Sequence, residues 1–173
     1  MKKSELKRWI RDIPNFPREG IIFKDLSTLL RNKEALRKSV DLLASRFKKE
    51  KIDFVVGVEA RGFIFGAVLA YKLKAGFVPV RKKGKLPYKT RSITYALEYG
   101  TDTLEVHEDA IAPGSRVVIV DDLLATGGTS KAVIDLIKGQ DAVIVGLAFL
   151  VELKFLKGKE RLKDFPIYSV IKY

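Results

Sequence analysis

The stretch VVIVDDLLATGGTS, residues 117–130, joins an apolar run to a helix start through two acids and a turn of small residues. Its first four residues are β-branched and show no polar alternation, which is typical of a strand buried on both faces of a parallel sheet. Asp121 and Asp122 follow at the carboxyl end of this strand, and we expect the helix to begin near Ser130. Ligands of open α/β sheets bind outside the carboxyl ends of the strands, so the sequence predicts a binding site here.

The small residues between the acids and the helix predict a phosphate site. Residues 125–129, Ala-Thr-Gly-Gly-Thr, offer backbone N–H groups, hydroxyls and freedom for positive φ in front of a helix N-terminus. Carboxylates repel phosphate but accept hydrogen bonds from hydroxyls, so the predicted ligand resembles ribose 5-phosphate. A capped helix after a tight turn is the plain alternative, which the ordered run of acids, threonines and glycines disfavours. The chain has neither the lysine of a nucleotide P-loop here nor a Gly-x-Gly-x-x-Gly motif.

Composition excludes several classes of site. The 173 residues include no cysteine, which excludes disulfides, a thiolate nucleophile and cysteine metal ligands. The single histidine, His107, lies in an alternating charged stretch, so we expect it at a solvated strand position without a catalytic role. At this length we expect one domain, spanning residues 1–173.

The net charge is +12 and the sequence pI is about 9.8, which indicates an acidic partner. Nucleic acid and a polyphosphorylated small molecule both fit that charge. The longest apolar run, residues 142–151, is shorter than the ~20 residues that cross a bilayer, and the charged N-terminus is unlike a secretory signal. We therefore expect a cytoplasmic protein with no membrane partner.

Apolar periodicity predicts the remaining elements. A first helix is expected to begin at a Ser4 cap, to end at Pro14 and to carry Leu6, Trp9, Ile10 and Ile13 on one face. Further helices are expected at 32–48, at about 62–71 and after 130, with strands at 53–58, 76–80, 142–151 and 167–171. Residues 94–107 alternate around Gly100 and predict a hairpin, and residues 152–164 are interpreted as charged surface.

Two further loops carry charge where a ligand would meet it. Residues 59–63, Glu-Ala-Arg-Gly-Phe, follow a predicted strand, and a glycine after Arg61 at a helix start favours an anion nest; a local Glu59–Arg61 pair is the alternative. Residues 81–91 contain six cations and no acid. Gly84 and Pro87 favour a hinged lid there, whereas a solvated loop or a nucleic-acid patch is the alternative. Lid and hairpin together would span about 81–108.

Residues 121–129 resemble the 5-phosphoribosyl 1-pyrophosphate (PRPP) motif of type I phosphoribosyltransferases, and Asp-Asp-Leu-Leu-Ala-Thr-Gly-Gly-Thr is similar to the version in the adenine-specific family. Four other segments resemble that family and occur in its order across the chain. They are Phe-Pro-x-x-Gly-Ile-x-Phe-x-Asp at 16–25, Glu-Ala-Arg-Gly at 59–62, Arg-Lys-x-Gly-Lys-Leu-Pro at 81–87 and Leu-Glu-Tyr-Gly at 97–100.

The resemblance implies a type I phosphoribosyltransferase fold: a twisted, mainly parallel sheet with helices on both faces, a β-hairpin flap (hood) and an N-terminal base-binding segment. It implies adenine and PRPP as substrates, AMP and pyrophosphate as products, and a place in purine salvage. It also implies Mg²⁺ as cofactor and a homodimer. The sequence offers no all-protein metal cage, so we expect Mg²⁺ to be held mainly by PRPP.

The same resemblance implies roles for individual residues. The phosphate would lie on Ala125, Thr126, Gly127, Gly128 and Thr129, with PRPP also bound by Arg61, Lys82, Lys85, Asp121 and Asp122. Adenine would be bound by Ile22, Phe23, Lys24 and Leu123, although the family often has arginine where this chain has Lys24. The implied catalytic residues are Glu98, Arg61, Lys85, Asp121 and Asp122, with Glu98 as general acid. A cross-strand salt bridge is the alternative role for Glu98.

Two other functions are compatible with the sequence. A regulator of the same fold that senses PRPP or purines and binds nucleic acid would suit the net charge of +12. Against it, no DNA-binding module remains once the predicted core is assigned, and we expect no nucleic-acid partner. A phosphoribosyltransferase for guanine, hypoxanthine or xanthine is the second.

Overall fold

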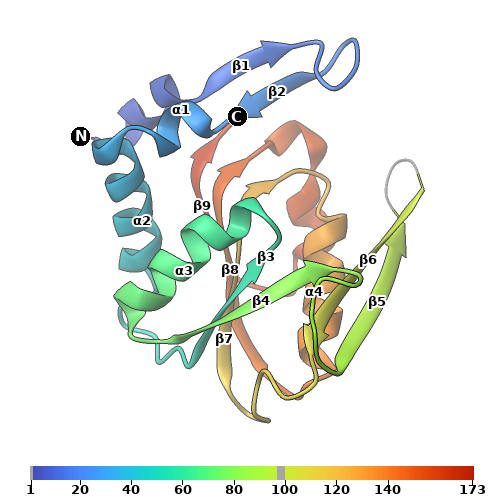
Figure 1. Cartoon of the computed structure of the whole chain (residues 1–173). Helices are drawn as coiled ribbons and strands as arrows, with labels where there is room; N and C mark the ends of the chain where they lie inside the picture. The colour runs from blue at the N-terminus through green and yellow to red at the C-terminus, as the bar shows by residue number, and fades with distance from the viewer. Residues whose placement is uncertain (1, 97–99) are drawn as a thin grey trace.

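The computed structural model describes residues 2–96 and 100–173 and contains a seven-stranded sheet flanked by helices (Figure 1). The strand order is β5-β6-β4-β3-β7-β8-β9; the five strands from β4 to β9 in that order are parallel, while β6 and β5 are antiparallel additions. The expected mainly parallel sheet is therefore confirmed. The strands are β3 (Phe54–Val58), β4 (Gly76–Lys82), β5 (Thr90–Ala96), β6 (Thr101–His107), β7 (Arg116–Leu124), β8 (Val143–Glu152) and β9 (Ile167–Lys172).

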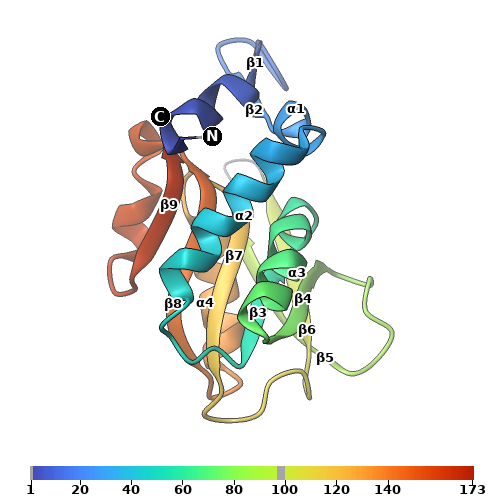
Figure 2. The same ribbon diagram turned by 90° about the vertical axis from the view of Figure 1, so that its left-hand side faces the viewer.

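Helices cover both faces of this sheet (Figure 2). On one face lie α2 (Lys33–Phe47) and α3 (Arg61–Leu73), and on the other lies α4 (Gly128–Lys138). The helix expected at 32–48 is confirmed as α2, which Asn32 caps: the N–H of Ala35 donates to the Asn32 side chain at 2.9 Å. None of the helices in the described part of the chain is long and apolar enough to span a bilayer.

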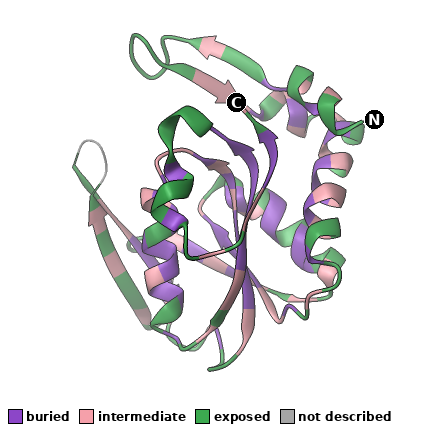
Figure 3. Cartoon of the chain, turned by 180° about the vertical axis from the view of Figure 1, so that it is seen from behind, coloured by how far each residue is buried: buried purple, intermediate pink, exposed green. Residues whose placement is uncertain are grey.

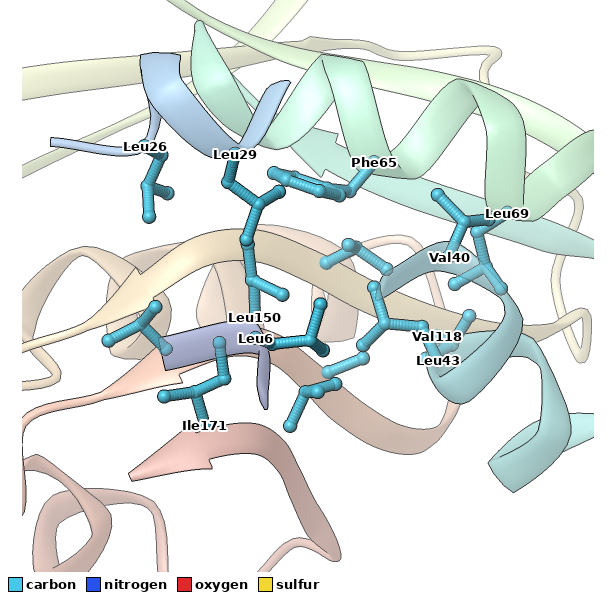
Figure 4. Packing of buried hydrophobic residues seen from close by; sticks show 14 of the residues in the cluster. Leu6, Leu26, Leu29, Val40, Leu43, Phe65, Leu69, Val118, Leu150 and Ile171 are labelled. Carbon is cyan, nitrogen blue, oxygen red and sulfur yellow. The ribbon is translucent and has the colours of Figure 1, made fainter. Parts of the chain in front are cut away.

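Strand β7 is buried on both faces, as predicted. Val118 and Val120 belong to the core beneath α2 and α3, whereas Val117 and Ile119 belong to the core beneath α4. All four are fully buried, and Figure 3 shows the same burial along the central strands. Figure 4 shows one face of this core, formed by side chains such as Phe65, Leu69, Val40, Leu43, Val118 and Leu150. Full burial of one such side chain contributes about 1.5–3 kcal/mol.

The strand extends further than predicted, to Leu124, because β8 continues to pair with it up to Glu152. Asp121 and Asp122 therefore lie within the last part of β7, at its carboxyl end as predicted. Likewise α4 begins at Gly128, two residues before the expected Ser130.

The prediction of a first helix from Ser4 to Pro14 is wrong. A 3₁₀-helix, η1 (Lys3–Trp9), is followed by β1 (Arg11–Pro14), which pairs antiparallel with β2 (Ile22–Asp25) and aligns Ile13 with Phe23. The pairing with β2 overrides the helical spacing of the apolar residues. The cap is also different, because the N–H of Lys2 donates to the Glu5 side chain at 2.9 Å. A short helix, α1 (Ser27–Leu30), then leads to α2.

The interpretation of residues 152–164 as charged surface is confirmed for its charged side chains, of which all but Glu152 are exposed, but the segment is also anchored in the core. The segment forms two short 3₁₀-helices, η2 (Lys154–Leu156) and η3 (Gly158–Leu162), and Glu152, Gly158 and Leu162 are buried. Its few apolar residues suffice to anchor it, since Leu162 is 1% exposed and packs in the core beneath α4.

His107 is not at the solvated position that the alternating charges predict. Its side chain is half-buried, Nε2 is enclosed, and the ring lies edge-on to Tyr88 at 6.2 Å between centroids. The hairpin itself is confirmed, because β5 and β6 pair from Ala96↔Thr101 to Thr90↔His107.

Candidate active site

Two adjoining clefts open at the carboxyl ends of the central strands and share Asp121 and Thr129. The larger has a volume of about 240 Å³ and is lined by Val58, Glu59, Ala60, Arg61, Lys82, Tyr95, Asp102, Leu104, Asp121, Asp122 and Thr129. The smaller, of about 70 Å³, is lined by Asp121 and by residues 123–130. The structure thus brings together Arg61, Lys82 and the segment 121–129, which are far apart in the sequence.

The acids at the end of β7 contact each other and the first residue of α3. Nε of Arg61 lies 2.8 Å from Oδ2 of Asp122, and the N–H of Asp122 donates to Oδ1 of Asp121 at 2.8 Å. Burial, followed by the charge of Asp122, raises the pKa of Asp121 well above its ordinary value. Burial also raises the pKa of Asp122, although the guanidinium of Arg61 opposes that rise.

Gly62 permits the close approach of α3 to β7. A β-carbon at this position would lie 2.9 Å from the carbonyl oxygen of Val120 and 3.0 Å from Oδ1 of Asp121. Any larger residue would push the start of α3 away from the strand end. The glycine after Arg61 is therefore needed for the contact between Arg61 and Asp122.

The turn of small residues forms a cradle at the N-terminus of α4. Gly127, the N-cap residue, has φ of +81°, the left-handed conformation that glycine adopts without strain. The first N–H groups of a helix have no intrahelical partner and its N-terminus carries partial positive charge, so the smaller cleft is suited to an anion. The hydroxyl of Thr129 lies 3.3 Å from that of Tyr95, which connects the cradle to β5 of the hairpin.

The ends of β3 and β4 and the start of β6 contribute ion pairs that the sequence did not indicate. The carboxylate of Glu59 accepts from the backbone N–H of Lys82 at 2.8 Å and from Arg81 at 3.3 Å, so the alternative of a Glu59–Arg61 pair does not form. Burial alone would raise the pKa of Glu59, but the N–H of Lys82 and the guanidinium of Arg81 outweigh it and lower the pKa. Nζ of Lys82 lies 3.1 Å from Oδ2 of Asp102, which raises the pKa of Lys82.

Lys85 does not line either cleft. It is exposed in the connection between β4 and β5, where its carbonyl oxygen accepts from Arg81 at 3.0 Å. Tyr95 and Asp102 line the larger cleft instead and were missed from the sequence. They occupy directly opposed positions of the hairpin, but alternation alone does not tell which face of an exposed hairpin meets a ligand.

The N-terminal hairpin places Phe23 beside the larger cleft. The guanidinium of Arg61 lies 5.5 Å from the centroid of the Phe23 ring, and Phe16 meets that ring edge-on at 5.2 Å. Ile22 is exposed on the same strand. The ammonium of Lys24 donates to the carboxylate of Asp12 at 2.7 Å and also lies over the ring of Tyr173.

Leu123, the remaining residue predicted to bind adenine, is half-buried on β7 and lines the smaller cleft. Glu98, the predicted general acid, lies outside the described residues, between Ala96 and Gly100 of the hairpin. In the described part of the chain, no group of three or more histidine or acidic side chains is arranged to hold a metal ion.

Comparison with known proteins agrees with this geometry. Residues 25–172 match the phosphoribosyl transferase domain model. The adenine phosphoribosyltransferase of Syntrophotalea carbinolica is 59% identical over 170 residues, covering 98% of this chain and 99% of the relative, and that of Brachyspira hyodysenteriae is 54% identical over 169 residues with the same coverage.

Solved structures give the same result. The crystal structure of adenine phosphoribosyltransferase from Thermoanaerobacter pseudethanolicus has a TM-score of 0.96 and 50% identity, and covers 99% of this chain and 100% of its own. The Saccharomyces cerevisiae enzyme, complexed with adenine and an imino-altritol bisphosphate, has a TM-score of 0.91 and 44% identity over 97% of each chain. The domain match, the identities of 54% and 59% over nearly the full length of both relatives and the TM-scores of 0.96 and 0.91 have one explanation: this chain belongs to the adenine phosphoribosyltransferase family.

Proposed function

We propose that this protein transfers the 5-phosphoribosyl group of PRPP to adenine, giving AMP and pyrophosphate. The observation that carries the proposal is the position of Arg61. Its guanidinium contacts the carboxylate of Asp122, lies over the ring of Phe23 and lines the larger cleft beside Lys82. The proposed sites for ribose, base and pyrophosphate therefore meet at one side chain.

The ribose 5-phosphate part of PRPP would span the two clefts. Its phosphate would be bound by the cradle of 125–129, where the helix N-terminus and the threonine hydroxyls supply donors. Its hydroxyls would donate to Asp121, which lines both clefts, and to Asp122, which lines the larger one. This arrangement keeps the carboxylates about one sugar-length from the phosphate, which avoids direct repulsion between them.

Pyrophosphate would leave towards the cationic side of the larger cleft. Arg61 and Lys82 line that side, and closure of the lid would bring Lys85 to the departing charge. As pyrophosphate leaves, positive charge develops on the ribose, and the carboxylates at the end of β7 face it and stabilise it. A pKa raised by burial would fall again once Mg²⁺ and the developing cation are present, since each favours the charged carboxylates.

The donor set fits Mg²⁺ arriving on its substrate. Carboxylate oxygens such as those of Asp121 and Asp122 are ligands that Mg²⁺ accepts, yet Mg²⁺ is usually held by one or two of them plus substrate phosphates. When bound, the ion would neutralise part of the charge of pyrophosphate. Asp121 and Asp122 would contact it directly or through its waters.

Adenine would lie against the ring of Phe23, with the backbone of Ile22 and Lys24 reading its polar edge and Leu123 packing beside it. Because Lys24 is committed to Asp12, its side chain supports the hairpin rather than the base. The substitution of lysine for the family's usual arginine therefore leaves the proposed backbone contacts unchanged. Glu98 would share a proton with the imidazole nitrogen that does not attack, and so stabilise charge on adenine as the bond forms.

A homodimer formed through α3 completes the proposal. The apolar N-terminal segment is unsuitable for this contact, because Trp9 is half-buried and packs against the core. Instead Ile64, Val68 and Tyr71, spaced to lie on one side of α3, are exposed by 40%, 40% and 84%. An apolar stripe of this kind suits a self-complementary contact about a two-fold axis. It begins one turn after Arg61, so the contact would also brace the site.

Base selection tests the function. A site that pairs the amino group of adenine leaves buried groups unpaired with a carbonyl base, so kcat/KM for hypoxanthine and guanine should be lower by about 10⁴-fold. Assays with radiolabelled PRPP and each base in turn measure this. Equal turnover of hypoxanthine would indicate a different purine specificity, and tight duplex binding without turnover would favour the regulator.

Replacing both acids, Asp121→Asn with Asp122→Asn, should remove most activity and leave the protein folded.

The raised pKa values mean that the folded state holds these protons more tightly than the unfolded chain does. The two carboxyls thus favour folding below their ordinary pKa of 3.8, and that contribution is lost as the pH rises through the folded values. The free energy of unfolding of wild type, measured with urea at a series of pH values, should show this decline, and that of the double variant should not. Asp109→Asn, at an exposed acid, is the control. A double variant that cannot fold would make the pair structural.

Glu98→Gln should lower turnover by about 10²-fold, the usual contribution of one acid–base group, with little change in PRPP affinity. Steady-state kinetics across a range of pH measure both quantities. Glu108→Gln, at an exposed position after the hairpin, should leave both unchanged. Near-normal turnover of Glu98→Gln at every pH would reduce Glu98 to a structural residue of the flap.

Val68→Glu should convert a wild-type dimer to monomers, because it places a charge at the centre of the α3 stripe. Sedimentation velocity measures the mass in solution. Val143→Glu, a matched change at a residue 47% exposed on β8, should remain dimeric. A monomeric wild type, or a Val68→Glu dimer as stable as wild type, would contradict an interface on α3.

A further inference from the structure

The helix η3, formed by Gly158–Leu162, packs directly against the cradle at residues 125–129 (Figure 1). A β-carbon on Gly158 would lie 2.1 Å from the carbonyl oxygen of Ala125 and 2.9 Å from the backbone nitrogen of Gly127. Reciprocally, a β-carbon on Gly127 would lie 2.6 Å from the carbonyl oxygen of Gly158. Real β-carbons do not approach backbone atoms this closely, so glycine at both positions permits the contact.

The other end of η3 is fixed in the core by Leu162, which is 1% exposed and belongs to the same cluster as Val133 and Ile137 of α4. Gly158 at one end and Leu162 at the other therefore hold the intervening residues at a defined place beside the N-terminus of α4. The charged residues between Gly158 and Leu162 are therefore exposed but fixed in place at both ends of η3.

Arg161 is the residue that this anchoring directs at the cradle. A β-carbon on Gly128, the first residue of α4, would lie 3.5 Å from Nη1 of Arg161. Arg161 is exposed and forms no hydrogen bond or ion pair with any described residue. A guanidinium beside the positive end of a helix is electrostatically unfavourable unless an anion lies between them. No contact with another described residue accounts for its position, whereas an anion bound on the cradle would.

We propose that Arg161 binds the 5-phosphate of PRPP and of AMP, as a cation that η3 supplies to the cradle at residues 125–129. The guanidinium presents paired N–H donors that match phosphate oxygens, and the flexible side chain spans the short gap from Gly128 to a phosphate on the helix N-terminus. The cradle would supply neutral backbone donors and Arg161 the charge. The inference rests on the proposed phosphate site in the smaller cleft.

Paired ligands test this inference. AMP and adenosine differ only in the phosphate, so titration calorimetry of both with one protein isolates the phosphate contribution. Arg161→Gln should weaken AMP about tenfold and leave adenosine unchanged, because one charge-assisted contact is lost. Arg161→Lys should recover part of the loss. In turnover, Arg161→Gln should raise KM for PRPP while KM for adenine stays the same.

A matched control separates a local contact from the general field of a basic protein. Lys159→Gln removes the same charge from an exposed residue of the same helix and should bind AMP as wild type does. Equal weakening by Lys159→Gln, or AMP affinity of Arg161→Gln equal to wild type, would overturn the role of Arg161. If wild type itself bound AMP no more tightly than adenosine, the proposed phosphate site in the smaller cleft would be wrong. That outcome is distinct from one in which only the role of Arg161 is wrong.

Discussion

Two adjacent carboxylates at the end of a strand buried on both faces are the constraint on which the site depends. The apolar residues that place β7 at the centre of the sheet also carry Asp121 and Asp122 out of bulk water, and burial raises the pKa of both. The contact of Asp122 with Arg61 compensates part of that cost. A charged ligand that binds here enters an environment already arranged for charge, with little reorganisation left for the reaction itself.

Close backbone approaches bring the other elements to this strand end. Gly62 lets α3 reach β7, and Gly158 lets η3 reach the turn before α4, in each case because a β-carbon would clash with backbone oxygen. These contacts make the position of Arg61, and that of the cradle, a consequence of main-chain packing. The hairpin joins the same site through Tyr95 and Asp102, whose contacts with Thr129 and Lys82 are polar and partly solvated. Such contacts are weaker, which suits a flap that admits substrate.

Errors made from the sequence have identifiable physical causes. The apolar residues of 4–13 recur at helical spacing, but residues 11–14 gain backbone hydrogen bonds by pairing with β2, and this tertiary contact outweighs local preference. Residues 152–164 are mostly charged, so the burial of Leu153 and Leu162 and the close backbone contact of Gly158 were not visible in the composition. His107 is half-buried and its ring contacts that of Tyr88, a contact between two segments of the chain that no local pattern encodes.

What the sequence determined by itself was the order of strand, acids, small-residue turn and helix at 117–130, because β-branched runs, adjacent acids and glycines each have a local physical meaning. That order, repeated at 53–63, was enough for the mainly parallel sheet and for the edge at which a ligand binds. Only the tertiary structure decided which charges meet. Arg61 pairs with Asp122 rather than Glu59, Glu59 holds Arg81, and Arg161 reaches the N-terminus of α4. Ion pairs form between residues distant in sequence, and their partners are selected by main-chain packing, which no single stretch of sequence contains.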